Sequence, residues 1–122
     1  MLQKKLINVS AITKGGPYSH AVVAGNFVFI SGQTGQLPDK KTIFEEQFNN
    51  AMEKVKRILE ESTTSIDNVI KITVYIADAK YFKKLNEMFN KFFELSQPAR
   101  TTIISRFVSD EILVEIDVIA IV

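Results

Sequence analysis

The stretch Val114-Glu115-Ile116-Asp117-Val118-Ile119-Ala120-Ile121-Val122 decides the fold. Successive side chains of a β-strand point to opposite faces of a sheet, so this stretch predicts a strand with two different faces. Every second residue from Val114 to Val122 is apolar, and that face suits packing against helices. The opposite face places Glu115 and Asp117 among apolar neighbours, and it is too apolar to meet bulk water.

Other strands are predicted upstream of this one. Two short apolar runs, Ala21–Ala24 and Phe27–Ile30, are joined by Gly25-Asn26, and this turn predicts a β-hairpin because both residues tolerate positive φ. Residues 69–76 alternate and predict a strand, with Ile70 on its apolar side and Lys71 on its polar side. Two closing strands are predicted over residues 101–107 and 112–122.

Helical spacing marks two segments between the strands. Thr42 and Glu45 have the spacing of a capping box, which predicts a helix start there. Apolar residues then recur every three or four positions up to Leu59, as expected for an amphipathic helix. A second helix is predicted from about Lys80 to Leu95, with an aromatic stripe that we interpret as core packing. Pro98 follows its end.

The order strands, helix, strand, helix, strands predicts an α+β sandwich in which two helices cover one face of a mixed sheet. The length of 122 residues fits a single domain over residues 1–122. Because no further helix is predicted to cover the second face of the last strand, another subunit is the simplest cover. The sequence therefore predicts a homo-oligomer with Glu115 at or near the interface.

Composition excludes several classes of function. The net charge of +1, from 15 basic and 14 acidic residues, argues against nucleic acid and membrane surfaces as partners. Without cysteine, and with His20 as the single histidine, neither a disulfide nor a histidine- or cysteine-based metal site is possible. We expect no metal and no cofactor. The chain shows no signal peptide and no transmembrane segment, so a soluble cytoplasmic protein is expected.

Four polar stretches contain the candidate site residues. Arg100 opens a strand just after Pro98, where a guanidinium can grip a carboxylate, although a surface or interface ion pair is the alternative. Glu115 is flanked by apolar residues that could raise its pKa for proton transfer, the alternative being an interface salt bridge. Tyr18 follows a Gly-Pro turn, and Gly32 after Ser31 permits either close approach of a ligand or a β-bulge.

Two further residues have weaker cases. His20 is near Tyr18, and an unperturbed histidine changes charge close to neutral pH, yet a histidine without a partner is usually a satisfied polar residue, so we place it only at the edge of the pocket. Lys71 lies on the polar side of its strand, where a solvated or interface lysine is expected, and we do not predict covalent catalysis by it. Nucleotide-binding loops and serine-hydrolase motifs are absent from the sequence.

In this order, the four stretches resemble the Rid family, the reactive intermediate deaminases once called the YjgF family. The resemblance spans nearly the whole chain. His20 stands where the family has glutamine, Asp117 stands where it has glutamate, and the loop from Thr34 to Ile43 is shorter than usual. The matching motifs are Gly16-Pro17-Tyr18-Ser19-His20-Ala21-Val22, Ser31-Gly32-Gln33, Pro98-Ala99-Arg100-Thr101 and Val114-Glu115-Ile116-Asp117-Val118-Ile119-Ala120, with the central strand 68–76 and Leu85-Asn86 also similar.

The resemblance implies a chorismate-mutase-like homotrimer with clefts between subunits. It also implies cofactor-independent hydrolysis of enamine and imine acids, such as 2-aminoacrylate and 2-iminobutanoate, to 2-oxo acids and ammonia. By analogy, Arg100 holds the substrate carboxylate and Glu115 activates the attacking water. The same analogy assigns orientation of the imine to Tyr18 and to the backbone around Ser31, Gly32 and Thr102, and support of the pocket to Asn86.

Three alternatives remain open. The cleft could bind a 2-oxo acid or another small carboxylate as an effector, which needs Arg100 but not Glu115. An RNA-directed role, as described for some relatives, fits poorly with the neutral charge and the single histidine. A purely structural trimer needs neither residue. The preferred imine and the effect of His20 on specificity are left open by the sequence.

Overall fold

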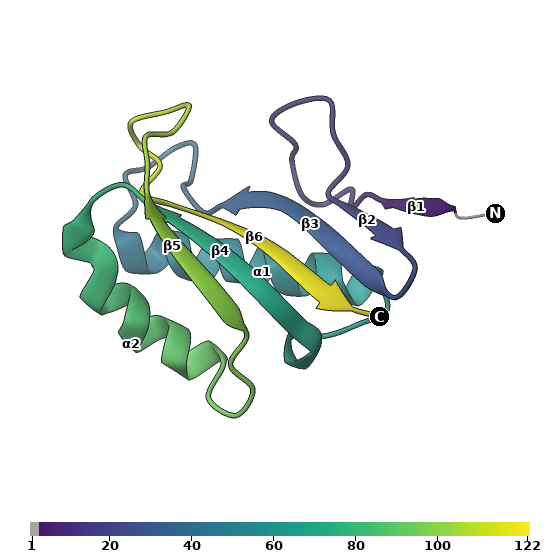
Figure 1. Cartoon of the computed structure of the whole chain (residues 1–122). Helices are drawn as coiled ribbons and strands as arrows, with labels where there is room; N and C mark the ends of the chain where they lie inside the picture. The colour runs from purple at the N-terminus through teal and green to yellow at the C-terminus, as the bar shows by residue number, and fades with distance from the viewer. Residues whose placement is uncertain (1–2) are drawn as a thin grey trace.

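One six-stranded sheet, in the order β1-β2-β3-β6-β4-β5, organises the computed structural model, which describes residues 3–122 (Figure 1). β4 and β5 run parallel, whereas the other neighbouring strands run antiparallel, so the sheet is mixed as predicted. The strands are β1 (Lys4–Ile7), β2 (Ala21–Ala24), β3 (Phe27–Thr34), β4 (Val69–Ile76), β5 (Ala99–Ile104) and β6 (Val114–Ile121).

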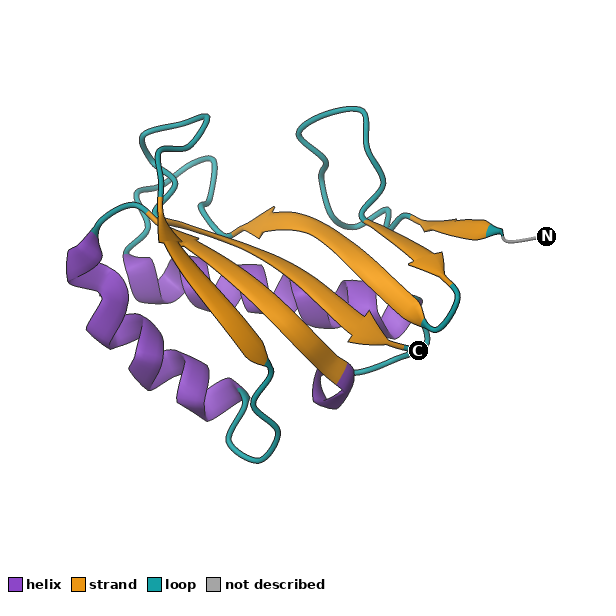
Figure 2. Cartoon of the chain, in the orientation of Figure 1, coloured by secondary structure: helices purple, strands orange, loops and turns teal. Residues whose placement is uncertain are grey.

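Two α-helices, α1 (Phe44–Glu61) and α2 (Phe82–Phe92), lie on the same face of this sheet (Figure 2). Short 3₁₀ turns, η1 (Ile66–Asn68) and η2 (Ala79–Tyr81), precede β4 and α2. This arrangement confirms the predicted two-layer α+β sandwich. Within residues 3–122, no helix combines the length and the hydropathy needed to cross a membrane.

The core forms between the helices and the sheet face that they cover. The apolar stripe of α1 is buried from Phe44 to Leu59, and Val114, Ile116 and Val118 of β6 are almost inaccessible to solvent. Gly25 in the predicted hairpin turn has φ +59°, a conformation that glycine adopts without steric cost. Most of the aromatic stripe of α2 packs as predicted, but Phe82 is 46% exposed.

Two local predictions are wrong. No capping box forms, because the N-cap of α1 is Ile43 and the Thr42 hydroxyl instead accepts a hydrogen bond from Gln47. Ile70 is 40% exposed because the β4–β6 pairing shifts register between Val69 and Lys71. Such a bulge inserts one unpaired residue and turns the following side chains to the other face.

Element boundaries also differ from the predictions. β3 continues through Thr34 into the segment that was predicted as loop, and β1 was not predicted at all. The second helix is shorter than the span Lys80–Leu95, and Val122, expected on the covered face of the last strand, is exposed beyond the end of β6. The last two strands end at Ile104 and Ile121 rather than at Phe107 and Val122.

The sheet face away from α1 and α2, here called the open face, is rich in apolar side chains. Phe27 and Phe29 of β3 lie opposite Ile121 and Ile119 of β6, which places their side chains on this face together with Glu115. The large apolar strand residues that lie on this face and are at least 40% exposed are Leu6, Phe27, Phe29, Ile70, Ile103 and Ile121. The open face thus has the composition predicted from β6, and its cover by a homotrimer remains a prediction.

Candidate functional site

Glu115 lies where three strands meet. On β6 it is paired with Thr34 of β3 on one side and with Tyr75 of β4 on the other. Its half-buried carboxylate lies directly against Gly32, where β3 has a bulge: a Cβ built on this glycine would collide with Oε2 and lie 2.9 Å from Cδ. The Glu115 carboxylate occupies the place that the Cβ of any other residue at position 32 would take. Glycine therefore lets the carboxylate lie directly against the backbone of β3.

The electrostatic setting of Glu115 favours proton exchange. Burial raises the pKa of its carboxyl group, and the negative charge of Asp117 raises it further. Asp117 itself accepts a hydrogen bond of 3.1 Å from the Tyr75 hydroxyl. Within residues 3–122, no hydrogen bond reaches the Glu115 carboxylate. A carboxylate with a raised pKa and free oxygens is suited to act as a general base toward water.

Glu115 lines an open pocket of about 1020 Å³ together with Tyr18, Ser31 and Gly32. The Tyr18 hydroxyl accepts a hydrogen bond of 3.1 Å from the Gly15 N–H, which leaves its own proton free to donate. The Ser31 hydroxyl donates to the Ser19 carbonyl at 2.7 Å, so its proton is engaged. Four of the predicted site residues therefore share one pocket.

His20 and Lys54 line the same pocket but are held by the backbone. His20 is 2% exposed and its Nδ1 accepts a 2.9 Å hydrogen bond from the Val9 N–H, while burial lowers the pKa of its imidazole. The Lys54 ammonium donates to the Thr34 carbonyl at 2.8 Å, and burial lowers its pKa as well. Lys54 was not predicted as a pocket residue, although it follows Gln47 by seven positions on the same side of α1.

A second cluster surrounds Arg100 on β5. One guanidinium nitrogen donates to the Asn86 side-chain oxygen at 2.7 Å, and the group lies 4.8 Å from the ring centre of Phe89 and 5.7 Å from that of Phe82. Cation–π contact and a hydrogen bond fix the orientation of the side chain. Thr102, two residues further along the same strand, has a buried hydroxyl without a hydrogen-bond partner in residues 3–122.

The two clusters lie on opposite faces of the sheet within one chain. Arg100 and Thr102 are level with Ile72 and Val74, whose side chains are buried on the face that the helices cover. Glu115 points to the open face, and β4 separates its strand from β5. Arg100, Thr102 and Asn86 are not among the residues that line the pocket of Glu115. A single chain therefore does not bring its predicted carboxylate anchor to its predicted base.

Fold and geometry together define a class: a small two-layer α+β protein with a glutamate-lined pocket at one end of the sheet and an orientated arginine at its edge. The family model described as Endoribonuclease L-PSP matches residues 8–122. The chain belongs to this family, whose members are also named RutC, YjgF and Rid proteins.

Relatives agree with this assignment. A RutC family protein of Pyrococcus abyssi is 40% identical over 110 residues, which cover 86% of each chain. Reactive Intermediate Deaminase A of Arabidopsis thaliana, a chloroplast protein, is 37% identical over 91 residues, covering 71% of this chain and 49% of that one. The crystal structure of the Rid family protein YyfA from Yersinia pestis superposes with a TM-score of 0.89 at 27% identity, covering 98% and 100% of the two chains.

Proposed function

We propose that this protein hydrolyses reactive enamine and imine acids to 2-oxo acids and ammonia without a cofactor. The observation that carries the proposal is the half-buried Glu115 carboxylate, which lies against the bare backbone of Gly32 in a pocket that Tyr18 also lines. The proposed substrates are small imine acids with one carboxylate beside the C=N carbon, such as 2-iminopropanoate and 2-iminobutanoate. The cytoplasm is the proposed compartment.

The reaction needs little machinery, because an imine carbon is already electrophilic. Glu115 takes a proton from water as the water oxygen bonds to the imine carbon and the C=N π electrons move to nitrogen. Glu115 hands this proton to the nitrogen, which gives a neutral carbinolamine. Glu115 then takes the O–H proton of the carbinolamine and delivers it to the nitrogen, so that ammonia leaves as the C=O bond forms and the carboxylate is regenerated. The sum is imine acid plus water giving 2-oxo acid plus ammonia.

Arg100 anchors the substrate carboxylate in this proposal, and it does so from a second copy of the chain. Its guanidinium is already orientated by Asn86 and by two aromatic rings, which suits bidentate binding of a carboxylate. The apolar open face beside Glu115 is the surface that the second copy would cover. A homotrimer with a site between each pair of neighbours satisfies both requirements.

Activity is tested by coupling a threonine or serine dehydratase to the purified protein and measuring 2-oxo acid formation where spontaneous imine hydrolysis is slow. Arg100→Ala and Glu115→Ala should each remove most of the acceleration. Arg106→Ala and Glu60→Ala remove the same charges from exposed positions and should leave it intact. Equal acceleration by wild type and both site variants would refute the proposed roles.

Mixing the two inactive variants tests the shared site. If a site takes Arg100 from one copy and Glu115 from its neighbour, random reassembly of equal amounts restores about a quarter of the sites. If both residues serve within one chain, mixing restores nothing. Sedimentation equilibrium of each variant before mixing checks that the oligomer is retained.

A small-carboxylate sensor is the alternative that the same experiment addresses. A sensor would bind 2-oxobutanoate through Arg100, lose binding in Arg100→Ala and keep it in Glu115→Ala, with no acceleration of hydrolysis in any form. The family description names an endoribonuclease, but the net charge of +1 and the burial of His20, whose Nδ1 accepts from the Val9 N–H, give little support for RNA cleavage here. RNA binding that is absent even at low salt would dispose of that alternative.

A further inference from the structure

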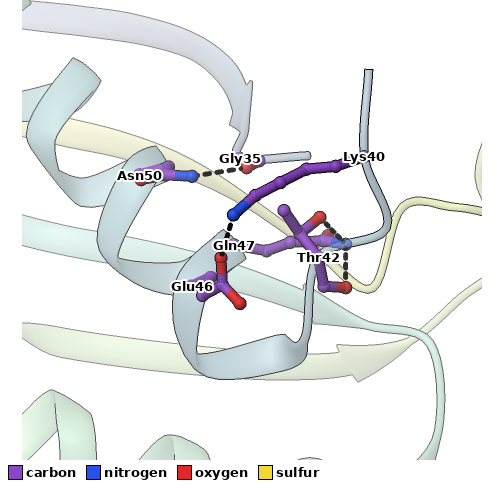
Figure 3. Close-up of polar contacts among 6 residues, drawn as sticks. All are labelled: Gly35, Lys40, Thr42, Glu46, Gln47 and Asn50. Carbon is purple, nitrogen blue, oxygen red and sulfur yellow. Dashed lines mark hydrogen bonds and ion pairs between the residues drawn. The ribbon is translucent and has the colours of Figure 1, made fainter. Parts of the chain in front are cut away.

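Gln47 in the first turn of α1 is a buried amide in which both polar atoms are hydrogen-bonded. The residue is 1% exposed. Its Nε2 donates to the Thr42 hydroxyl at 3.0 Å and to the Thr42 carbonyl at 3.2 Å, as Figure 3 shows. The same nitrogen lies 2.9 Å from the Glu111 carbonyl oxygen, so its two hydrogens serve three acceptors and one N–H is shared, while Oε1 accepts from the Leu113 N–H at 2.8 Å. One side chain therefore joins the loop before α1 to the segment before β6.

The bonded segment leads directly to Glu115. The Leu113 N–H is held by Gln47, and its carbonyl accepts a 3.0 Å hydrogen bond from the Ala77 N–H just beyond β4. The backbone is thus fixed through both of its polar groups two residues before Glu115. The β3–β6 pairing ends at Thr34 opposite Glu115, so the contacts of Gln47 extend the order of the sheet past that end.

Two residues near Gln47 on α1 hold the end of β3, the strand that pairs with β6. Asn50 donates to the Gly35 carbonyl at 2.9 Å (Figure 3), and Lys54 donates to the Thr34 carbonyl at 2.8 Å. Gly35 packs so tightly that a Cβ there would collide with the Gln47 carbonyl oxygen. Positions 47, 50 and 54 lie along one line of the helix, so α1 holds the end of β3 and the entry to β6 from one side.

We propose that Gln47 is a positioning residue for Glu115: its amide holds the entry to β6 so that the carboxylate lies against Gly32. The inference rests on the proposed function for its kinetic part only. An amide suits the role because its two N–H donors match the carbonyl and hydroxyl oxygens on one side, and its oxygen matches the N–H on the other side.

The test replaces Gln47 by methionine, which keeps the length of the side chain and removes its hydrogen bonds. The first readout is the pKa of Glu115, followed by the ¹³C signal of its carboxyl group in an NMR titration. If the entry to β6 relaxes, Glu115 moves from its half-buried place toward water, and its pKa falls toward the ordinary value. The second readout is imine hydrolysis, for which kcat should fall about 10- to 100-fold. KM should stay within about twofold, because Arg100 is untouched.

Controls separate positioning from lost stability. Ile58→Val lowers stability at the far end of α1 and should move neither the pKa of Glu115 nor kcat in the folded protein. Asn49→Ala changes an exposed neighbour on the helix and should change neither readout. If Gln47→Met does not fold, Thr42→Val removes one acceptor of the amide and should shift both readouts in the same direction by a smaller amount.

The outcomes are distinct from those of the proposed function. A folded Gln47→Met, or Thr42→Val in its place, with the Glu115 titration and kcat of the wild type overturns the positioning role while deaminase activity stands. If the wild type hydrolyses no imine, the titration alone decides: a lowered pKa of Glu115 in the variant supports positioning, and an unchanged one overturns it.

Discussion

Replacing Gly32 by alanine adds a single methyl group at the point where β3 meets the Glu115 carboxylate. The new Cβ would lie 2.9 Å from Cδ and 3.2 Å from Cγ of Glu115, and it would overlap Oε2. Ordinary carbon contacts are about 3.5–4.0 Å, so the two side chains cannot both keep their present positions. The atoms that the new Cβ would meet belong to the end of the flexible Glu115 side chain, so we expect the Glu115 carboxylate to rotate away from residue 32.

Whether Glu115 rotates away or stays in place decides how much stability and how much kcat Gly32→Ala loses. Retaining the overlap would cost about 1–3 kcal/mol of stability, the usual range for overpacking. Rotation of Glu115 avoids most of that cost but removes the base from the reacting water. Positioned acid–base groups contribute about 10²- to 10⁴-fold to rate, so kcat should fall within that range while Tm changes little.

The assay is dehydratase-coupled 2-oxo acid formation, with thermal unfolding measured on the same samples. Gly25→Ala is the matched control: nothing lies within 4 Å of its new Cβ, but φ is +59°. A left-handed conformation costs alanine about 1–2 kcal/mol, so this variant should lose stability and keep kcat. Gly32→Ala should therefore lower kcat and leave Tm nearly unchanged, whereas Gly25→Ala should lower Tm and leave kcat unchanged.

A double substitution shows whether the effect passes through Glu115. In a Glu115→Ala background, Gly32→Ala no longer meets a carboxylate, so it should cause little further loss of rate. Wild-type kcat in Gly32→Ala, or a full second loss in the double variant, would show that the contact with Glu115 is not what makes glycine necessary.

Three further predictions concern charge. Arg100→Lys should raise KM about tenfold or more, because an ammonium group cannot give two parallel hydrogen bonds; steady-state kinetics checks this. Glu115→Gln should raise Tm at neutral pH, because a group whose folded pKa is raised stabilises the fold below its unfolded pKa and loses that contribution as pH rises through the folded pKa. The gain should vanish below about pH 4.3, as thermal unfolding across pH would show. Asp117→Asn removes a charge that raises the pKa of Glu115, so the acid limb of the kcat/KM profile should move to lower pH.

The alternation of β6 was enough to predict the two layers and the apolar open face, because side-chain period and burial are local properties of a strand. The predictions that were wrong are those in which a tertiary contact overrides a local sequence pattern. The hydroxyl of Thr42 has the spacing of a cap, yet the buried amide of Gln47 bonds to it instead. Ile70 continues an apolar alternation, yet a bulge against β6 turns it outward.

The sequence could suggest which side chains have suitable chemistry for a site, but not where those side chains lie relative to one another. Glu115 and Gly32 are far apart in the sequence, and their contact depends on a bulge in β3 whose position alternation does not reveal. The side of the sheet that Arg100 faces depends on the parallel register of β5 against β4. Register between strands is fixed by long-range packing, so the sequence motif could not show that Arg100 and Glu115 lie on opposite faces.

The polar groups of the open face bear on whether a second copy can cover it. Burying a polar group costs free energy unless it is hydrogen-bonded. The Tyr75 hydroxyl already donates to Asp117 at 3.1 Å, and the Lys71 ammonium lies 2.6 Å from the Thr101 hydroxyl. These pairs lower the cost of removing the face from water. Glu115 differs, because within residues 3–122 its carboxylate has no such partner, and a second copy that covered the face would leave this group to bind the reacting water.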